Sequence, residues 1–353
     1  MTVSDMLFQD DFQANHMSNA EIINNRRVIN GYDDGLMQAS PLKHPWARDI
    51  FKKMQKNNWV AEEVSFQRDY EQWINNELTE NEKTAFERAL AFASNLDGLL
   101  TKTLSELIKP HITSPEVSLA ISRQVYEEAL HVDSYSCMIE ALGFNAEKIY
   151  GLYRTDKKLY YKNKQVLSAA AKIATPNFKT GTPETDQLFL EACITNLIFE
   201  GIFFYSAFII FYVLGRHNKM PGSREMIQFI NRDEDLHVSL FVNIVNTIKE
   251  EQPELWNDQV KRTYSESIKA AVEMEYDWGR SCINDGILGL TPINLKEYLE
   301  FIGDMRLTAL GLPKIWNSQN PFPWIDEMTQ GNMIEVNFFE GKVKEYQTGT
   351  LQW

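Results

Sequence analysis

Glu128-Ala-Leu-His131 and Glu234-Asp-Leu-His237 are two copies of one short pattern, a glutamate followed three residues later by a histidine. Three residues span about one helical turn, so each pair presents a carboxylate and an imidazole on one helix face. A lone acid precedes each pair in the chain, Asp97 before the first and Glu200 before the second. Four carboxylates and two histidines from four helices form the ligand set of a dinuclear metal centre, so the pattern predicts an all-α bundle around such a centre.

Each of these acids lies on an apolar stripe with helical spacing, which points it toward the core. On a solvated helix a single Glu-x-x-His pair is a common accident, and salt bridges are the simpler explanation of a buried acid. Few lysines or arginines share these stripes, however, and an isolated buried carboxylate is costly unless it is paired or binds a metal. The stripes are Phe86, Leu90, Ala93, Asp97, Leu100 and Leu104; Val117, Ile121, Gln124, Glu128, His131, Tyr135 and Met138; Leu197, Glu200, Phe204, Ala207 and Phe211; and Ile227, Ile230, Glu234, His237, Phe241, Ile244 and Ile248.

The chemistry of the six side chains narrows the choice of metal. Carboxylates and imidazoles are hard to borderline donors, and no cysteine belongs to the set, so iron or manganese fits better than a structural zinc. We expect two iron ions, with manganese as the alternative that the sequence leaves open. A redox-active pair of ions that shares carboxylates can react with dioxygen.

The overall composition is that of a folded, acid-rich protein. The 353 residues are 44% hydrophobic and 12% aromatic, and the formal net charge of −14 argues against nucleic acid or an anionic membrane as the main partner. The cysteines, Cys137, Cys193 and Cys282, form no C-x-x-C pair and indicate a reducing compartment. The acidic N-terminus has no apolar run typical of a signal peptide, so we expect a cytoplasmic protein.

One apolar run, residues 193–214, is long enough to span a bilayer. It carries Asn196 and Glu200 in its first third, however, and no other segment resembles it. A carboxylate in the middle of a bilayer is costly, whereas a helix that is apolar on all sides is what the centre of a large bundle buries. We therefore expect a core helix and no membrane span.

Changes in composition divide the chain into three regions. Residues 1–45 are polar and predict an irregular arm, residues 46–324 show helical periodicity almost throughout, and residues 325–353 predict a flexible tail with an apolar end. Proline and glycine residues predict the helix breaks within the central region. These breaks fall at 109–110, 143, 176–183, 221–222, 252–253 and 290–292.

Tyr135 lies four residues after His131, one further turn along the same inward face. A tyrosine at such a position is usually only a packed core side chain with a satisfied hydroxyl. Beside two redox-active ions, in a pocket that we expect Phe204, Phe208 and Ile230 to line, its phenol is placed to be oxidised. A dry apolar pocket would protect the resulting phenoxyl radical.

The chain resembles the small (beta) subunit of class I ribonucleotide reductase over nearly its whole length. No single matching segment would suffice, but together the segments are very specific. They are Trp59-Val-Ala-Glu-Glu-Val, Asn95-Leu-Asp97, Glu128-Ala-Leu-His-Val-Asp-Ser-Tyr135, Phe199-Glu-Gly-Ile-Phe-Phe-Tyr205, Asn231-Arg-Asp-Glu-Asp-Leu-His237 and Asn320-Pro-Phe-Pro-Trp324.

The resemblance implies a ferritin-like helical bundle, with extra helices around it and usually homodimeric, that holds the dinuclear centre in its core. The centre and dioxygen would oxidise Tyr135 to a tyrosyl radical, which passes to the large (alpha) subunit and starts the reduction of ribonucleotides to deoxyribonucleotides. The chain would then be the beta subunit of a ribonucleoside-diphosphate reductase, active only with the alpha subunit. The implied ligands are Asp97, Glu128 and His131 for one ion, and Glu200, Glu234 and His237 for the other.

Radical transfer between subunits needs redox-active intermediates, and the resemblance assigns these to particular residues. His131, Asp233 and Trp59 form the implied path, with Asp233 joining the metal-bound imidazole to the indole. Taken alone, Asp233 would be a surface-helix acid and Trp59 a core side chain. In the C-terminal tail Tyr346 is the candidate for the last relay, and the apolar end would dock into the large subunit; a tail without a role is the alternative.

Two positions favour the tyrosyl-radical type within this family. Residue 135 is a tyrosine rather than the phenylalanine of the radical-free manganese–iron subclass, and residue 97 is an aspartate where that subclass tends to have glutamate. Gln124 stands where several members have tryptophan, so electron delivery during assembly of the centre is expected to differ. The metal loaded in the cell, the need for an activating flavoprotein, allosteric regulation and the choice between di- and triphosphate substrates stay open.

Three rival hypotheses share the metal ligands. A ferritin-like di-metal oxidase or oxygenase acting on an organic substrate would not need Trp59, Asp233 and an apolar-ended tail together. An iron-storage protein is commonly shorter and lacks the tyrosine and the relay. A catalytically silent homologue is disfavoured because the ligands are intact.

Overall fold

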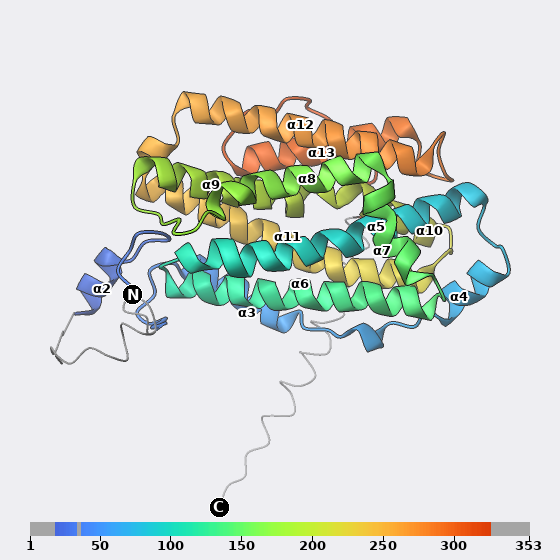
Figure 1. Ribbon diagram of the computed structural model, residues 1–353, viewed down its shortest axis with the longest axis horizontal. Helices are drawn as coiled ribbons and strands as arrows, with labels where there is room; N and C mark the ends of the chain where they lie inside the picture. Colours follow the sequence, from blue (N-terminus) through green and yellow to red (C-terminus); the bar gives the residue numbers. More distant parts are fainter. Residues whose placement is uncertain (1–17, 34–36, 326–353) are drawn as a thin grey trace, which may run out of the picture.

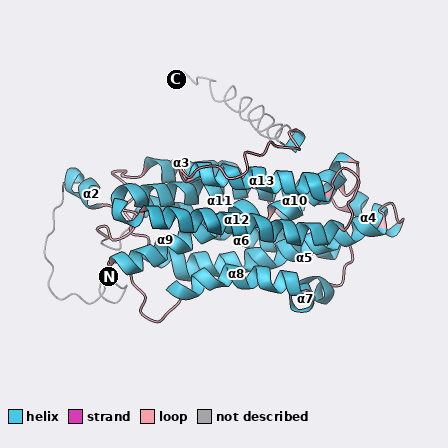
Figure 2. Ribbon diagram, turned by 90° about the horizontal axis from the view of Figure 1, so that it is seen from above, coloured by secondary structure: helices cyan, strands magenta, loops and turns pink. Residues whose placement is uncertain are grey.

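The computed structural model describes residues 18–33 and 37–325, and this part of the chain is built from helices (Figures 1 and 2). Outside the helices, the described residues contain one isolated β-bridge, between Ile287 and Leu290. The all-α class predicted from the helical periodicity is therefore confirmed. The elements are α2 (Asn19–Asn25), α3 (Pro45–Lys56), η1 (Ala61–Glu63), α4 (Gln67–Ile74), α5 (Glu80–Lys102), η2 (Thr103–Ile108), η3 (Lys109–His111), α6 (Pro115–Ala141), α7 (Ala146–Thr155), α8 (Lys157–Ile173), α9 (Pro183–Ile198), η4 (Phe199–Phe203), α10 (Tyr205–Arg216), α11 (Pro221–Glu251), η5 (Pro253–Leu255), α12 (Asp258–Ile283) and α13 (Pro292–Ala309).

Four long helical segments form the centre of the bundle, and each carries part of the predicted ligand set. Asp97 lies on α5, the first Glu-x-x-His pair on α6, Glu200 on the segment α9–η4–α10, and the second pair on α11. Helix α5 packs against α6 and α10, while α11 packs against α6, α9 and α10 (Figure 1). The apolar stripes of the four segments therefore face one another.

The helices begin where the sequence supplies capping groups. Thr79 accepts a hydrogen bond from the Glu82 amide at the start of α5, and the Glu82 side chain returns to the Thr79 amide. The Ser114 hydroxyl accepts from the Val117 amide at the start of α6. All the helix breaks predicted from proline and glycine lie at the ends of helical elements or between them, so these predictions are confirmed.

The segment Pro183–Arg216 is long and apolar enough to cross a membrane, yet its apolar window is 100% buried inside the fold. It is the core helix that the sequence predicted. The segment is not α-helical throughout, because Phe199–Phe203 (η4) forms a π-helical turn between α9 and α10. A π turn contains one residue more than an α-helical turn. The spacing of apolar residues in the sequence does not reveal that extra residue here, because nearly every neighbouring position is apolar.

Further helices surround the four-segment centre. Helix α3 packs on α6 and α11. Helix α7 packs on α5, and α8 packs on α9. Helices α12 and α13 each pack on both α10 and η4. The arm predicted as irregular contains the short helix α2, capped by Ser18. The Arg26 guanidinium lies 3.4 Å from the Glu116 carboxylate in a buried ion pair, which ties the arm to α6.

Candidate metal centre

The six predicted ligands meet at the centre of the bundle, where none of them is exposed to solvent. Their ligand atoms fall into two groups, and within each group these atoms lie within 4.8 Å of one another. The first group is Asp97, Glu128, His131 and Glu234, and the second is Glu128, Glu200, Glu234 and His237.

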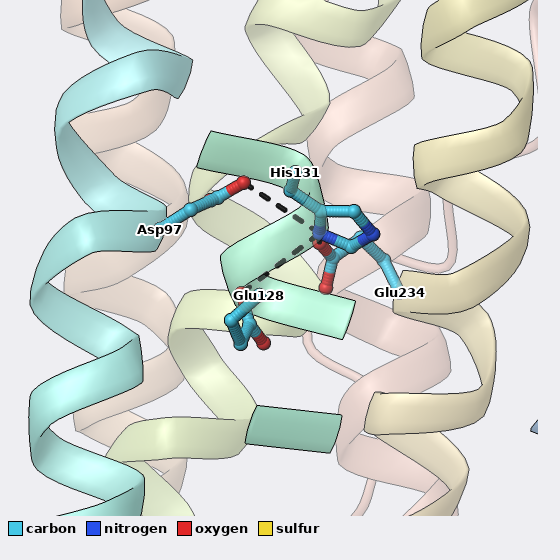
Figure 3. A group of neighbouring side chains, drawn as sticks. All are labelled: Asp97, Glu128, His131 and Glu234. Atoms are coloured by element: carbon cyan, nitrogen blue, oxygen red, sulfur yellow. Dashed lines mark ion pairs between the residues drawn. The ribbon is translucent and has the colours of Figure 1, made fainter. Parts of the chain in front are cut away.

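The first group gathers around one nitrogen of His131, as Figure 3 shows. His131 Nδ1 lies 3.1 Å from Glu234 Oε1, 3.6 Å from Asp97 Oδ2 and 3.9 Å from Glu128 Oε2. These atoms come from α5, α6 and α11, so the three helices converge on one point.

The second group gathers around the corresponding nitrogen of His237. His237 Nδ1 lies 3.0 Å from Glu234 Oε2, 3.2 Å from Glu128 Oε1 and 3.7 Å from Glu200 Oε2. The two imidazole rings are 5.8 Å apart between their centroids. The two groups are therefore neighbours in one site.

Glu128 and Glu234 belong to both groups. Each turns one carboxylate oxygen toward His131 and the other toward His237. The ligand division implied by the resemblance gave each of them to a single ion, whereas the geometry makes both of them candidates to bridge two ions. Asp97 and Glu200 each lie in one group only.

The unpaired atoms of the site fit a bound cation. Both oxygens of Asp97, together with Glu128 Oε2 and Glu200 Oε2, are buried and have no hydrogen-bond partner in the described structure. Buried polar atoms are almost always paired, so such a cluster needs an explanation. Carboxylate oxygens and imidazole nitrogens without thiolates are a donor set for iron or manganese.

The electrostatics of the protein without metal lead to the same conclusion. Burial, with the charge of Glu128 beside it, raises the pKa of the Asp97 carboxyl well above its usual range. Burial and the charge of Glu234 raise the pKa of Glu200 to about 8. Carboxylates this close disfavour one another's charged forms, and a divalent ion removes that repulsion.

Two amides hold Glu200 from the side away from His237. Gln124 Nε2 donates to Glu200 Oε1 at 2.7 Å, and Asn196 Nδ2 donates to the same oxygen at 3.1 Å. Gln124, which stands where several family members have tryptophan, is therefore a direct hydrogen-bond partner of a ligand. The other carboxylate oxygen of Glu200, Oε2, therefore still faces the ligand group that contains His237.

Each histidine meets an acid on its other nitrogen, and the arrangement is crossed. His131 Nε2 lies 3.4 Å from Asp233 Oδ2, and Asp233 directly precedes the Glu-x-x-His pair of α11. His237 Nε2 lies 3.0 Å from Glu127 Oε2, and Glu127 directly precedes the pair of α6. Each helix thus supplies the acid that orients the histidine of the other.

Asp233 also reaches the predicted tryptophan. Trp59 Nε1 donates to Asp233 Oδ2 at 2.7 Å, and the indole stacks near His131 with ring centroids 6.2 Å apart. Trp59 is only 1% exposed, in the loop between α3 and η1. The structure therefore brings Trp59, Asp233 and His131 together in the order that the resemblance implied.

Glu127 and its partner Arg123 are site residues that the sequence reasoning missed. Arg123 Nε donates to Glu127 Oε1 at 2.9 Å, and another guanidinium nitrogen of Arg123 donates to Asn58 Oδ1 at 3.1 Å, next to Trp59. One signal was available in the sequence, because an acid directly precedes both Glu-x-x-His pairs. Only the packing of α6 against α11 reveals which histidine each acid meets.

Tyr135 lies on α6 one turn beyond His131 and is fully buried. Its hydroxyl has no hydrogen-bond partner in the described residues. Burial and the nearby charge of Asp97 raise the pKa of Tyr135 well above its usual range, so the phenol is neutral. The predicted neighbours Phe204, Phe208 and Ile230 are all buried, and the two phenylalanines stack at 5.4 Å.

The remaining predicted site residue, Tyr346, lies outside the described residues, as does the apolar end of the tail. Its assignment as a relay stays a prediction.

Comparison with known proteins identifies relatives over almost the whole chain. Residues 36–321 match the family described as "Ribonucleotide reductase, small chain". The ribonucleoside-diphosphate reductase subunit beta of Chlamydia pneumoniae is 34% identical over 333 residues, 94% of this chain and 96% of the relative. The subunit of the same name from Treponema pallidum (strain Nichols) is 31% identical over 329 residues, 92% of this chain and 91% of the relative.

Solved structures agree with the sequence comparisons. The ribonucleotide reductase R2 subunit from Clostridium botulinum matches with a TM-score of 0.80 at 32% identity, covering 86% of this chain and 94% of that one. The similarity confirms the predicted ferritin-like helical bundle.

Proposed function

Because the chain belongs to the ribonucleotide reductase small-chain family, it is the radical-generating small subunit of a class I ribonucleotide reductase, and we propose which residues perform each part of that function. Tyr135 is the residue that becomes the radical. Asp97, Glu128, His131, Glu200, Glu234 and His237 hold the metal pair beside it.

The metal pair is two iron ions, with manganese as the alternative that the same donors accept. When bound, the pair supplies with dioxygen the oxidising power that removes one electron from Tyr135. The protein's part is to fix the ligands: Gln124 and Asn196 orient Glu200, while Asp233 and Glu127 orient the two imidazole rings. These contacts come from the chain itself.

Tyr135 would lose one electron to the oxidised metal pair and its phenolic proton to the neighbouring Asp97 carboxylate, whose charge acts on the hydroxyl, and would become a neutral radical. Complete burial keeps water and reductants away from the ring, which supports this role. The neutral state of the phenol before oxidation follows from its raised pKa.

Trp59, Asp233 and His131 form the path of the radical between Tyr135 and the large subunit. The 2.7 Å hydrogen bond from Trp59 to Asp233, and the 3.4 Å separation of Asp233 and His131, support this path. One electron moves from the large subunit toward Tyr135 along the path, and a proton returns from Asp97 to the phenol, which regenerates the tyrosine and leaves the radical in the large subunit. Tyr346 in the tail is the relay residue beyond Trp59.

Membership of the family supports the following proposal for the assembly. The chain forms a homodimer, works in the cytoplasm, and binds the large subunit through residues 325–353, while residues 46–324 form the helical domain and residues 1–45 the arm. Its relatives carry the name ribonucleoside-diphosphate reductase, which supports diphosphate substrates reduced in the large subunit.

The observation that carries this proposal is the pair of buried ligand groups sharing Glu128 and Glu234. The test is to load metal-free protein with ferrous iron in air, add the large subunit, and measure deoxyribonucleotide formation from ribonucleoside diphosphates. We expect turnover for the parent and none for Glu234→Ala. Turnover by a variant that has lost its metal would contradict the proposal.

A further inference from the structure

The π-helical turn Phe199–Phe203, which carries Glu200, is held by charged side chains from three other helices. Arg306 Nε of α13 donates to the Gly201 carbonyl at 2.9 Å, and Lys162 Nζ of α8 donates to the Phe203 carbonyl at 2.9 Å. Just beyond the turn, the Ser206 amide donates to Glu275 Oε1 of α12 at 2.9 Å. These contacts satisfy backbone groups that a π turn and a new helix start remove from the regular ladder.

Lys162 and Glu275 form an ion pair that is completely buried. The Lys162 ammonium lies 3.4 Å from the centroid of the Phe92 ring, and the Ser206 hydroxyl also donates to Glu275. Burial lowers the pKa of Lys162 to about 8 and raises the pKa of Glu275. A buried ion pair often adds little net stability to a fold. The position of this pair in the core therefore points to a role other than stabilisation.

Two glycines make room for these contacts. A Cβ atom at Gly201 would lie 2.8 Å from Arg306 Nε, and a Cβ atom at Gly279 of α12 would lie 2.7 Å from the Ser206 Cβ. A larger residue at position 201 would therefore push the guanidinium away from the turn, and one at position 279 would push α12 away from the start of α10. The backbone and the buried charges are therefore fitted to each other.

We propose that Lys162, Glu275 and Arg306 are positioning residues that hold the π-helical turn in register and thereby place the Glu200 carboxylate in the ligand group. Gln124 and Asn196 fix the carboxylate end of Glu200, and the three charged residues fix its backbone end. In Figure 1 the helices that supply them, α8, α12 and α13, lie together on the upper side of the bundle.

Loss of these contacts lets the turn relax toward a regular α-helix. Such a relaxation keeps every residue but shifts the register between α9 and α10 by one residue, which is about 100° of rotation about the helix axis, and Glu200 lies within the turn that takes up this rotation. Such a rotation withdraws Glu200 from its group, whereas Asp97, on α5, keeps its position. The affinity of the ion held by Glu200 and His237 therefore falls, and the ion beside Asp97 and His131 is affected less. This inference rests on the proposed role of Glu200 as a metal ligand.

The test compares two double variants of the full-length protein. Lys162→Met with Glu275→Gln removes both charges and leaves no isolated buried charge. The new amide side chain on α12 still offers Ser206 an acceptor. The Phe203 carbonyl, however, loses its donor. Arg26→Met with Glu116→Gln is the matched control, because it removes another buried ion pair about 18 Å along α6 from Glu128. Metal-free proteins are titrated with Mn(II) in the absence of oxygen, and free Mn(II) is measured by electron paramagnetic resonance.

We expect the parent and the control to bind two Mn(II) per chain with the same affinities. The Lys162/Glu275 variant should bind one of the two ions about tenfold or more weakly, as variants of outer ligand partners do. Hydrogen exchange should also become faster at amides 199–206 in this variant alone. Unchanged affinities and exchange rates would overturn the inference.

Gly201→Ala provides a second route that leaves every charge in place. Its new methyl group displaces Arg306, so it should also weaken one site and speed exchange at the turn. If Gly201→Ala binds both ions as the parent does, Arg306 has no positioning role. Fewer than two Mn(II) ions per chain in the parent would instead count against the proposed ligand set, so the two failures are distinguishable.

Discussion

Replacing Trp59 by phenylalanine separates radical formation from radical transfer. The indole is buried, and its Nε1 donates to Asp233 Oδ2 at 2.7 Å. Phenylalanine keeps an aromatic ring against Phe229 but has no donor and is far harder to oxidise. In this variant Asp233 Oδ2 would still lie 3.4 Å from His131 Nε2, so it would keep one partner.

The cost in stability can be worked from these contacts. Loss of a buried hydrogen bond to a charged acceptor costs about 1.5–3 kcal/mol. Truncation of a core tryptophan to alanine costs about 3–5 kcal/mol, and exchange for phenylalanine removes a minor part of that volume, about 1–2 kcal/mol. The sum, about 2.5–5 kcal/mol, is a large share of the stability of an ordinary domain, but it leaves a folded protein.

The assay measures three quantities on the same preparation. Urea unfolding gives the stability, electron paramagnetic resonance gives the tyrosyl radical yield, and deoxyribonucleotide formation with the large subunit gives the turnover. We expect lower stability, an unchanged radical yield and no turnover.

Trp73→Phe is the control for this experiment. Trp73 is a half-buried tryptophan of α4 that packs against Phe144 and is outside the proposed path. It should lose some stability and keep its turnover. Turnover in Trp59→Phe at the level of this control would refute the relay role of Trp59.

Three further predictions follow from other contacts. Gln124→Leu removes the 2.7 Å donor to Glu200 and should weaken metal binding about 10- to 100-fold, measured by Mn(II) titration with Gln228→Leu as the control. Burial alone would raise the pKa of Glu116, but hydrogen bonds from the Lys43 amide and from Ser114, with the charge of Arg26, lower it below its usual 4.5. The stability that Glu116 contributes is therefore present above pH 4.5 and is lost as the pH falls through its lowered pKa. The difference in urea midpoint between Glu116→Gln and the parent should shrink on acidification. A difference that stays constant with pH would contradict this role of Glu116. Deleting residues 339–353 should leave the radical yield intact and abolish turnover, whereas retained turnover would show that the tail has no role in transfer.

The sequence predicted the helices and the ligands because both leave a periodic signal. Apolar residues recur every three or four positions on each core segment, and the acids interrupt those stripes at positions that face inward. Asp97 and Glu200 were identified in this way although each stands alone in its helix. Asp97 and Glu200 lie beside the two Glu-x-x-His pairs in the structure. An acid inside an apolar stripe can therefore indicate a buried site.

The π turn at Phe199–Phe203 could not be predicted from the same signal. Every residue from Leu197 to Leu214 except Glu200 is apolar or small enough to be buried on any face, so a shift of one residue changes no pattern. The contacts that hold the turn come from α8, α12 and α13, far away in the chain. Tertiary contacts rather than local periodicity determine this part of the site.

The crossed arrangement of Asp233 and Glu127 was likewise beyond sequence reasoning alone. Both acids were visible beside the Glu-x-x-His pairs, but Glu127 gave no reason to prefer a role near His237 over a solvated position. The side-by-side packing of α6 and α11 decides this, because it brings the acid of one helix to the imidazole of the other. The resemblance supplied Asp233, and the structure supplied Glu127.

The proposed function requires that metal bound by the six ligands oxidises Tyr135 to a radical. The most direct measurement is an electron paramagnetic resonance spectrum after ferrous iron and air are added to metal-free protein, with Tyr135→Phe prepared in parallel and iron content measured in both. We expect a tyrosyl signal in the parent, none in the variant, and two iron ions per chain in each. A tyrosyl signal of equal size in Tyr135→Phe, or an iron-loaded parent that gives no such signal with either iron or manganese, would contradict it.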